Sequence, residues 1–449
     1  MTAWMALYNF FYLPALAAVL TGFFFSKRRK MLGRWREEIF ERLFSPVERI
    51  RQKAGNRPLV WAHAASVGEV HAAKGLLQAL KKKHPETFIV LSTTTQSGKE
   101  AAAKIAEAEC VLLFPLDFYP ALSRLLRLRV KLLLLVETEL WPNLIFLARR
   151  RGAAIAVVNG RLSERSFPRY RRARFFLSAL LGQIDLFCVQ EPADAERFIA
   201  LGAGAERTRT VGNLKYDAAP QDSQELIDLI DKKLSRLGWS ASEDPIFLAG
   251  STHPEEEGDV LRGYLAAQRR FPRLKLVLAP RHLDRLAETL AHIEACGVSW
   301  TLWDGAGSGG ESPRCLVVNR LGLLSVLYGR ARIAFVGGTL ADRGGHNLLE
   351  PAQRGIPVMF GPHTSNVPQI SRRLVEAGGG MQVTDGQEIG ARLLEALADP
   401  DGLARQGAAA RRTAASFRGA VEKTLLELAP LLNSPRAEAT IPRTAGHAP

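Results

Sequence analysis

Cysteine is scarce in this 449-residue sequence, and its four cysteines lie far apart. Cys110, Cys188, Cys296 and Cys315 form no Cys-x-x-Cys spacing, so we expect neither a disulfide framework nor a thiolate metal site. The first, second and fourth of them lie within apolar runs or at their edges. We therefore predict buried, reduced thiols in a cytosolic domain.

Patterns that hold a metal or a dinucleotide are missing as well. The Asp-x-Asp motif Asp399-Pro400-Asp401 falls in an expected turn between helices, and no cluster of His, Asp and Glu has convincing ligand spacing. No Gly-x-Gly-x-x-Gly follows the first expected strand, which weakens a dehydrogenase interpretation. We predict no metal site and no bound cofactor.

Negative charge is in deficit, because 45 Asp and Glu oppose 60 Lys and Arg and leave a formal charge of +15. This excess attracts anionic partners such as phosphorylated lipid, a nucleotide sugar or nucleic acid, and composition does not choose between them. Apolar residues make up 47% of the chain and charged residues 23%, which is the balance of a folded protein. The length predicts two domains of about 150–200 residues each.

Charge is also absent from the first 26 residues. Ala3–Phe25 is long and apolar enough to cross a bilayer core of ~30 Å, and Lys27-Arg28-Arg29-Lys30 follow at once. A cleaved signal peptide carries its charges before the apolar stretch, which is the reverse order. We therefore predict a membrane anchor in residues 1–30. It would be a single inner-membrane span with the rest of the chain on the cytoplasmic face, near anionic lipids. An interfacial helix stays open, because Asn9 and Pro14 interrupt the stretch.

After Pro58, short apolar strands alternate with helical stretches, which predicts parallel sheets covered by helices. The expected strands are Leu59–Ala64, Phe88–Ser92, Val111–Phe114, Leu132–Glu137, Ala154–Asn159, Leu186–Gln190, Ile246–Ala249, Lys275–Ala279, Cys315–Val318, Ile333–Val336 and Val358–Phe360. The pattern restarts near residues 215–222. We predict two doubly wound, Rossmann-like α/β domains, at residues 31–217 and 218–432, and a disordered tail at 433–449.

Glu69 is the first residue to weigh, because ligands of open parallel sheets bind beyond the carboxyl ends of the strands. It follows the first expected strand and the turn Ser66-Val67-Gly68, at a helix start. A carboxylate at such a strand end can take a proton from an attacking hydroxyl. An acidic residue in a first helical turn is equally well explained by the helix dipole, so position alone leaves both interpretations open.

Three more charged residues lie near expected strand ends or the domain junction. Glu137 and Glu139 follow an apolar strand. Glu139 could simply cap or charge the next helix, whereas Glu137 has fewer structural explanations. Lys215 could neutralise a phosphate or a developing negative charge, or it could form an interdomain salt bridge with Asp217.

The second domain has its own candidates for an anion site. Ser251 and Thr252 follow one strand, and small hydroxyl residues at a helix start suit an anion. Arg281 follows the next strand and suits a bidentate phosphate contact.

A glycine-rich stretch adds to this anion site. Gly337-Gly338 and Gly344-Gly345 precede Asn347-Leu348-Leu349-Glu350, and the glycines would clear a path for a ligand. Asn347 and Glu350 have the spacing of a helix cap and its return contact, and Glu350 could also accept hydrogen bonds from both ribose hydroxyls of a nucleotide.

The order of these motifs resembles the 3-deoxy-D-manno-octulosonic acid (Kdo) transferases of lipopolysaccharide synthesis, over nearly the whole chain to about residue 430. The motifs are Ser66-Val67-Gly68-Glu69, Glu137-Thr138-Glu139-Leu140-Trp141-Pro142-Asn143, Asn159-Gly160-Arg161-Leu162-Ser163, Ser251-Thr252-His253, Pro280-Arg281-His282 and Gly344-Gly345-His346-Asn347. The resemblance implies a GT-B fold, with two Rossmann-like domains facing a cleft. It also implies inverting, metal-independent transfer of Kdo from CMP-Kdo to a lipid A precursor, lipid IVA.

The resemblance also implies roles for single residues. Glu69 matches the family's proton acceptor, and Glu137 and Lys215 match residues assigned to stabilising the transition state. Pro280-Arg281 and Asn347 through Glu350 match the CMP-binding segments.

One departure from the family falls at Asn319-Arg320-Leu321-Gly322-Leu323-Leu324, where Asp-Thr-Met/Ile-Gly-Glu-Leu is usual. Backbone contacts from Leu321, Gly322 and Leu323 to the nucleotide could survive, but a side-chain contact from the missing Glu cannot. Two alternatives therefore stay open: a GT-B enzyme that uses a UDP-sugar, and a non-catalytic membrane-bound binder of nucleotide or lipid. Nucleic acid is not an expected partner, because the basic residues gather near the membrane segment without stacking aromatics.

Overall fold

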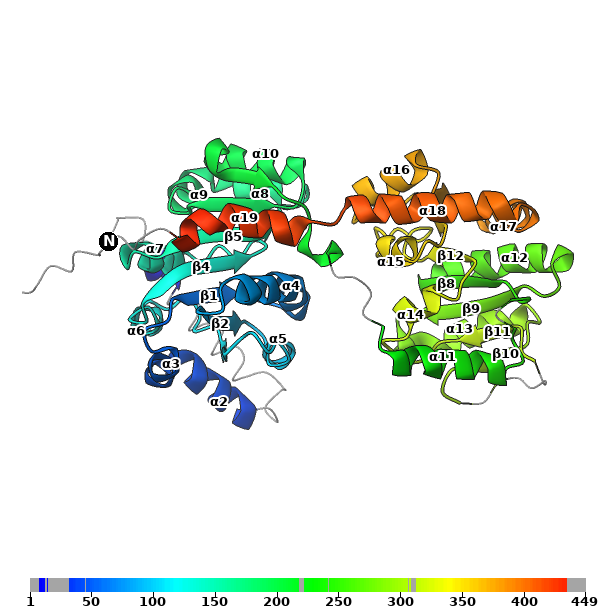
Figure 1. Ribbon diagram of the computed structural model, residues 1–449, viewed down its shortest axis with the longest axis horizontal. Helices are drawn as coiled ribbons and strands as arrows, with labels where there is room; N and C mark the ends of the chain where they lie inside the picture. Colours follow the sequence, from blue (N-terminus) through cyan, green and yellow to red (C-terminus); the bar gives the residue numbers. More distant parts are fainter. Residues whose placement is uncertain are drawn as a thin grey trace, which may run out of the picture. The chain divides into compact units, whose positions relative to one another are not determined.

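The protein is described here by a computed structural model that covers residues 8–12, 14, 32–44, 46–217, 222–240, 242–305, 307 and 312–433. The chain forms two compact units, Met1–Asp217 with Arg418–Pro449 and Ala218–Phe417 (Figure 1). Most of the predicted membrane anchor and, apart from Asn433 at the end of a helix, the predicted tail lie outside the described residues. Among the residues that are described, no helix combines the length and the apolar character that a bilayer span needs.

The first unit is built on a parallel sheet with the strand order β3-β2-β1-β4-β5-β6-β7. Its strands are β1 Leu59–His63, β2 Phe88–Thr93, β3 Cys110–Leu113, β4 Val130–Val136, β5 Ala154–Gly160, β6 Leu186–Val189 and β7 Thr208–Thr210. The chain order reverses at β1, which pairs with both β2 and β4. Open α/β sheets bind their ligands at such a switch point, beyond the carboxyl ends of the strands.

Helices cover both faces of this sheet. They are α2 Leu32–Leu43, α3 Val47–Ala54, α4 Val67–Lys83, α5 Gln96–Ala102, α6 Tyr119–Leu125, α7 Pro142–Arg150, α8 Phe167–Arg172, α9 Arg174–Leu181, α10 Pro192–Leu201 and α19 Ala420–Asn433. Neighbouring residues of a strand point to opposite faces, so Trp61 packs in one apolar layer and Val60 in the other. Apolar residues on both sides explain why these strands read as continuous hydrophobic runs.

Helix α19 belongs to the first unit, which corrects the predicted second domain that extended to residue 432. Its apolar positions Leu425, Leu428 and Leu432 join the same buried layer as Val60 and Leu77. Figure 1 shows α19, in red, lying across the first sheet. The amphipathic pattern predicts that this helix covers a sheet, but it carries no information on which sheet that is.

The side chain of Asp217 caps the start of α19. Its carboxylate accepts hydrogen bonds from the backbone N–H groups of Gly419 (2.7 Å), Ala420 (3.2 Å) and Val421 (2.5 Å). The salt bridge between Asp217 and Lys215 that the sequence left open does not form, because the Lys215 ammonium donates to Glu137 at 2.8 Å instead.

We expect Asp217→Ala to lower the free energy of unfolding of the first unit by about 1–2 kcal/mol, because the backbone donors at the helix start lose their acceptor. Urea denaturation monitored by circular dichroism measures this loss. Asp217→Asn keeps one acceptor oxygen and should lose less. Equal losses in the two variants would argue against a capping role.

The second unit repeats the plan with the strand order β10-β11-β9-β8-β12-β13-β14. The strands are β8 Ile246–Thr252, β9 Lys275–Pro280, β10 Trp300–Leu302, β11 Cys315–Val317, β12 Ile333–Val336, β13 Val358–Phe360 and β14 Gly380–Gln382. Strand β8 pairs with β9 and β12 in parallel, so the switch point of this sheet lies at the carboxyl ends of β8 and β12.

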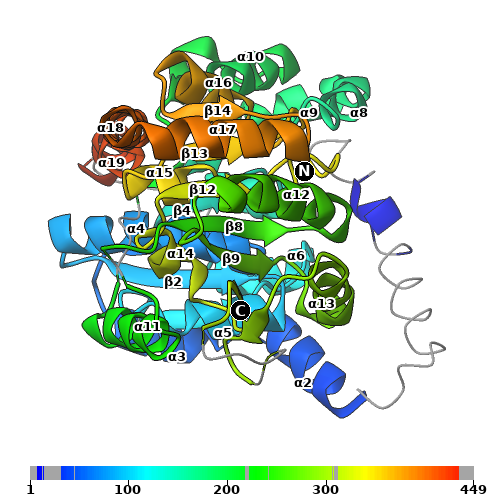
Figure 2. The same ribbon diagram turned by 90° about the vertical axis from the view of Figure 1, so that its right-hand side faces the viewer.

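Helices also flank the second sheet (Figure 2). They are α11 Gln224–Arg236, α12 Pro254–Arg270, α13 Leu286–Ala295, α14 Leu324–Tyr328, α15 Leu349–Gln353, α16 Pro368–Glu376, α17 Gly386–Ala398 and α18 Pro400–Ser416. Helices α12 and α17 pack closely, with Ile389 against Gly263 where a β-carbon has no room. All four cysteines are unpaired, as predicted; Cys188 and Cys315 are buried, whereas Cys110 and Cys296 are partly exposed.

Candidate active site

Glu69 lies in the first turn of α4, directly beyond β1 at the switch point of the first sheet. Its carboxylate accepts hydrogen bonds from the Ala65 N–H (2.7 Å) and the Ser66 hydroxyl (2.9 Å). Its own N–H donates to Ser66 Oγ at 3.3 Å, and Ser66 is the N-cap of the helix. This reciprocal arrangement stabilises the start of a helix, so Glu69 has a structural role.

Burial gives Glu69 a second property. Burial is the main reason why the pKa of the Glu69 carboxyl is raised to about 7; the hydrogen bonds from Ala65 and Ser66 oppose the rise, and the negative charges of Glu139 and Glu137 add to it. A general base works best when its pKa lies near the operating pH. A half-buried carboxyl beside two other carboxylates is therefore able to take up a proton near neutrality.

Glu137 and Lys215 form an ion pair at the same edge of the sheet. The backbone of Glu137 adopts φ 62°, a left-handed conformation that costs a non-glycine residue on the order of 1–3 kcal/mol and often occurs at functional sites. Lys215 Nζ donates to the Glu137 carboxylate at 2.8 Å. Asn213 orients the short turn Leu214–Tyr216 by accepting the Lys215 N–H at 3.0 Å.

Glu139 does not cap the next helix. It accepts a hydrogen bond from Trp141 Nε1 at 2.8 Å and lies 3.6 Å from Nε2 of the fully buried His63. The cap of α7 is Asp117, which accepts the N–H groups of Asn143 (2.8 Å) and Leu144 (2.9 Å). A pattern read along the chain does not reveal Asp117 as this cap, because it lies 26 positions before Asn143.

The described part of the N-terminal segment is tied to this Asp117 cap. The Tyr8 hydroxyl donates to Asp117 at 2.9 Å, and Asn9 and Asn143 exchange side-chain hydrogen bonds of 2.9 and 2.8 Å. Phe10 and Phe11 are 69% and 62% exposed. Asn9, which interrupts the apolar stretch, and Tyr8 therefore contact the rest of the unit, while Phe10 and Phe11 face outward.

In the second unit, Ser251-Thr252 and Pro280-Arg281 lie side by side. The Arg281 N–H donates to the Thr252 carbonyl at 2.9 Å, and Ser251 sits at a bulge with φ 57°. The Thr252 hydroxyl donates to the buried Glu257 at 3.0 Å. The Arg281 side chain is exposed, so it is free to reach an anion beyond the ends of β8 and β9.

The first glycine pair does not clear a path for a ligand, as the sequence pattern suggested. A β-carbon at residue 337 would lie 2.4 Å from Glu256 Oε1, and one at residue 338 would lie 3.0 Å from Cδ2 of His346. Gly337 and Gly338 therefore make room for the protein's own Glu256 and His346. Sequence spacing could not show this, because those partners come from other parts of the fold.

Asn347 and Glu350 contact each other through their side chains and do not form the capping box that their spacing suggested. Asn347 accepts the Leu349 N–H at 3.1 Å and donates to Glu350 at 3.2 Å. Helix α15 has only five residues and its cap position is Leu348, so Asn347 lies one residue before the cap. Burial raises the pKa of the Glu350 carboxyl.

The segment that departs from the family pattern is used for packing. Leu323, at the position of the family's Glu, is only 2% exposed, whereas Leu321 is 76% exposed and Gly322 has φ 88°. The buried Leu323 precedes helix α14. The missing carboxylate has thus been exchanged for a core side chain.

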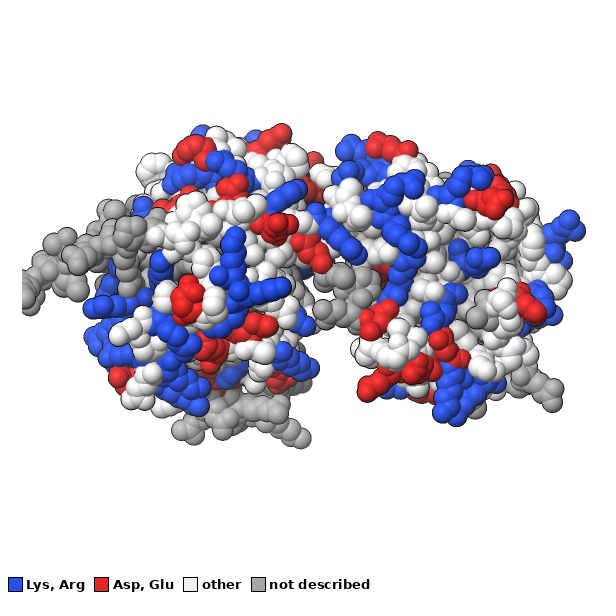
Figure 3. All heavy atoms as spheres, in the orientation of Figure 1, with Lys and Arg blue, Asp and Glu red and all other residues white. Residues whose placement is uncertain are grey.

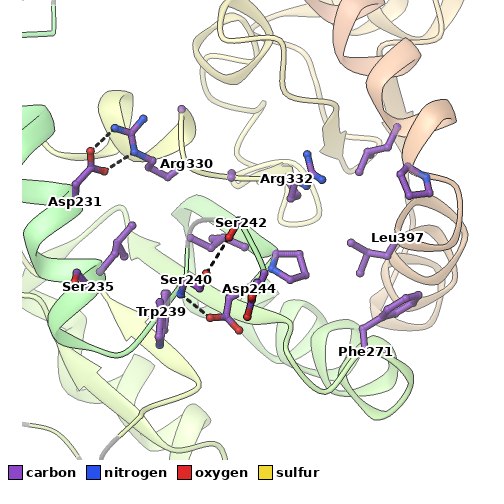
Figure 4. Close-up of a pocket in the computed structure, with 18 residues that line it drawn as sticks. Asp231, Ser235, Trp239, Ser240, Ser242, Asp244, Phe271, Arg330, Arg332 and Leu397 are labelled. Atoms are coloured by element: carbon purple, nitrogen blue, oxygen red, sulfur yellow. Dashed lines mark hydrogen bonds and ion pairs between the residues drawn. The ribbon is translucent and has the colours of Figure 1, made fainter.

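A hollow of about 910 Å³ in the second unit lies away from all of these residues. Trp239, Asp244 and Arg330 line it, and Arg330 pairs with Asp231 at 2.6 and 2.7 Å (Figure 4). It also touches Ile246, where β8 begins. Because sheets of this kind bind ligands at the carboxyl ends of their strands, we do not place the active site there.

The positive charge of the chain is dispersed on the face shown in Figure 3, where basic and acidic side chains intermingle on each unit. A nucleic-acid interface gathers its Lys and Arg residues on one patch or stripe. This face therefore gives no support to nucleic acid as a partner.

Comparisons with known proteins agree with the motif order. Residues 37–218 match the family model described as 3-deoxy-D-manno-octulosonic-acid transferase (kdotransferase). A 3-deoxy-D-manno-octulosonic acid transferase of Haemophilus influenzae is 34% identical over 83% of this chain and 87% of its own length. One of Bordetella pertussis is 32% identical over 92% of this chain and 96% of its own. A bifunctional glycosyltransferase/methyltransferase of Fusobacterium nucleatum is 36% identical over 74% of this chain, which spans about half (51%) of that longer protein.

Solved structures support the fold. The UDP-GlcNAc 2-epimerase of Neisseria meningitidis aligns with a TM-score of 0.57 at 10% identity, over 83% of this chain and 99% of its own. The Anabaena protein HepE with UDP aligns with a TM-score of 0.55 at 14% identity, over 83% and 99%. At these identities the likeness concerns the fold alone. The prediction of two parallel-sheet, Rossmann-like α/β units is confirmed.

Proposed function

This chain belongs to the Kdo transferase family and is a glycosyltransferase, and we propose that it transfers Kdo from CMP-Kdo to the lipid A precursor lipid IVA, with inversion at the anomeric carbon. The position of Glu69 and its raised pKa are the observations that support this proposal. A carboxyl whose pKa is raised to about 7 lies at the switch point of the first sheet, where a substrate hydroxyl is expected to bind.

In the proposed reaction, the Glu69 carboxylate takes the proton from a sugar hydroxyl of the acceptor as that oxygen attacks the anomeric carbon. The bond from this carbon to the phosphate oxygen breaks, and its electron pair leaves with CMP. A single displacement of this kind inverts the anomeric carbon. CMP is already a good leaving group, so the proposed reaction needs no metal ion.

The remaining site residues bind the nucleotide and stabilise its negative charge. Glu137 holds Lys215 at 2.8 Å and so orients a cation toward the negative charge that develops during transfer. On the donor side, the segments Ser251-Thr252 and Pro280-Arg281 bind the CMP, with the exposed Arg281 side chain on its phosphate. Backbone groups of Leu321, Gly322 and Leu323 and the segment Asn347-Leu348-Leu349-Glu350 hold the rest of the nucleotide.

The proposal places the enzyme at the inner membrane, with residues 1–30 as its anchor and the catalytic units on the cytoplasmic side. The uncharged stretch of 26 residues followed by Lys27-Arg28-Arg29-Lys30 supports this. Arg169, Arg171 and Arg172 of α8 would guide the bisphosphorylated acceptor, together with Arg174.

Mass spectrometry of the product tests the proposed function. The full-length protein is incubated with a CMP-Kdo generating system and lipid IVA, and the lipid should gain the mass of one or more Kdo residues. UDP-sugars in place of CMP-Kdo should give no transfer. Transfer from a UDP-sugar but not from CMP-Kdo would show that the donor is a UDP-sugar. Nucleotide binding without any release of CMP would show that the protein binds the nucleotide without catalysing transfer.

The raised pKa of Glu69 predicts how activity depends on pH. Only the carboxylate can accept a proton, so kcat/KM should rise as the pH increases through about 7 and fall in acid. Because the charge of Glu139 contributes to the raised pKa, Glu139→Gln should shift the rising limb to lower pH. Rate measurements from pH 5 to 9 locate the limb.

Glu86→Gln, at an exposed glutamate of the first unit, is the control for this experiment and should leave the limb in place. If the rising limb of the pH profile also keeps its position in Glu139→Gln, the electrostatic coupling between Glu139 and Glu69 is contradicted.

A further inference from the structure

Three histidines converge at the carboxyl end of the second sheet. His253 follows β8, His282 follows β9, and His346 lies in the loop after β12. The Nε2 atoms of His253 and His346 are 3.0 Å apart, and the two rings are parallel to within 2°. The His282 ring stands edge-on to His253, with 5.4 Å between the ring centroids. These residues surround the switch point between β8 and β12, where a ligand is expected.

The fold holds the two facing imidazoles in place. His253 is 7% exposed, and its backbone N–H donates to Glu256 at 3.0 Å. Glu256 also accepts the Gly338 N–H at 2.6 Å, and Gly338 lies so close to His346 that a β-carbon would touch the ring at 3.0 Å. One buried carboxylate thus fixes both the helix that carries His253 and the loop that supports His346.

The charged groups around this histidine pair favour the binding of an anion. Burial, and then the neighbouring His282, lower the pKa of His253, and Arg343 and Arg281 act in the same direction. Burial, and then His253 and Arg281, lower the pKa of His346 to about 4. Glu255 opposes these effects at His253, but it is paired with Arg343 at 2.7 Å. Both imidazoles are therefore neutral at pH 7, beside exposed positive charge.

Building on the proposed function, we propose that His253, His346 and His282 form, with Arg281, the seat of the donor's phosphate, and that this seat takes up one proton when the phosphate binds. A bound anion favours the imidazolium form. The added proton turns the contact between the two Nε2 atoms into a charge-assisted hydrogen bond.

The positive charge of the added proton acts in the transfer step. The phosphodiester of the donor carries one negative charge, and the phosphate gains a second as the anomeric C–O bond breaks and its electron pair moves to the phosphate oxygen. The N–H of the imidazolium that is not shared between the two rings then donates a hydrogen bond to this oxygen, while the acceptor's proton goes to Glu69. No other reactant is required. The histidine cluster would thereby stabilise the leaving group by preorganised charge.

Calorimetric titration with CMP and with cytidine tests the proposal, because the two ligands differ only in the phosphate. Titrations of the full-length protein at pH 7 in two buffers of different ionisation heat count the protons taken up. The wild type should take up more protons with CMP than with cytidine. His346→Gln should lose that difference and bind CMP roughly 10- to 100-fold more weakly, the value of a hydrogen bond to a charged group, with cytidine binding unchanged.

Two further variants keep the test decisive. His84→Gln, at a histidine of the first unit that pairs with Glu86, should behave as the wild type. His282→Gln changes an exposed side chain, and it should weaken CMP relative to cytidine without disturbing the fold. Free CMP is equally protonated in every titration at pH 7, so a difference between variants arises in the bound complex.

Equal proton uptake and equal CMP affinity in wild type and His346→Gln would overturn this inference and leave the proposed function standing. Failure of the wild type to bind either CMP or cytidine would instead remove the donor assignment, and with it the basis for the cluster.

Discussion

Replacing Glu69 with Gln is expected to lower kcat for transfer by about 10²- to 10⁴-fold, the usual contribution of a general base. Glutamine keeps one oxygen that can accept from the Ala65 N–H, and its amide NH2 can donate to the Ser66 hydroxyl, so the fold of the helix start should survive. CMP affinity should also be unchanged, because Glu69 belongs to the first unit and the nucleotide residues belong to the second. Initial rates of transfer and calorimetric CMP titration measure the two effects separately.

The chain offers a matched control for this variant. At the start of α17, Glu388 donates its N–H to the N-cap Asp385 at 2.9 Å, and its carboxylate accepts the N–H (2.9 Å) and hydroxyl (3.0 Å) of Thr384. Glu388→Gln changes a comparable capping contact with no substrate beside it, so it should cost similar stability and no activity. Near-normal turnover by the Glu69→Gln protein would show that Glu69 is not the general base.

Glu256→Ala should have the largest effect on stability, at least about 3 kcal/mol of unfolding free energy, because a buried acceptor of several hydrogen bonds is removed. Its carboxylate is 0% exposed and accepts the N–H groups of His253 (3.0 Å), Gly338 (2.6 Å), Leu340 (3.2 Å) and Ala341 (3.4 Å). These donors belong to the ends of β8 and β12. CMP binding should therefore be lost together with stability.

Chemical denaturation and CMP titration measure these losses, and the adjacent residue provides the control. Glu255 lies on the same helix, is exposed and pairs with Arg343, so Glu255→Ala should change stability by less than about 1 kcal/mol. Glu256→Gln keeps one acceptor oxygen and should fall between the two. If the losses of Glu255→Ala and Glu256→Ala were equal, the role given to Glu256 as the link between the two strand ends would be wrong.

The central strands were predictable from sequence, whereas three of the four edge strands were not. The buried runs around β1, β4 and β5 carry continuous apolar side chains, because both faces of a parallel sheet are covered. Strands β7, β10 and β14 have three residues each and lie at the edges of their sheets. Such short segments pair with one neighbour only and need no apolar run, so pattern reasoning passes over them.

By itself, the sequence determined the two parallel-sheet units and the family, and it pointed to Glu69 and Arg281 as candidate site residues, because strand periodicity and motif order are local properties. Tertiary structure alone decided which sheet α19 covers and that Lys215 pairs with Glu137, 78 positions away. It also decided that His253, His282 and His346 meet, and that Glu256 supports two of them. The physical reason is that strand order brings distant strand ends to one edge, and a pattern read along the chain contains no strand order.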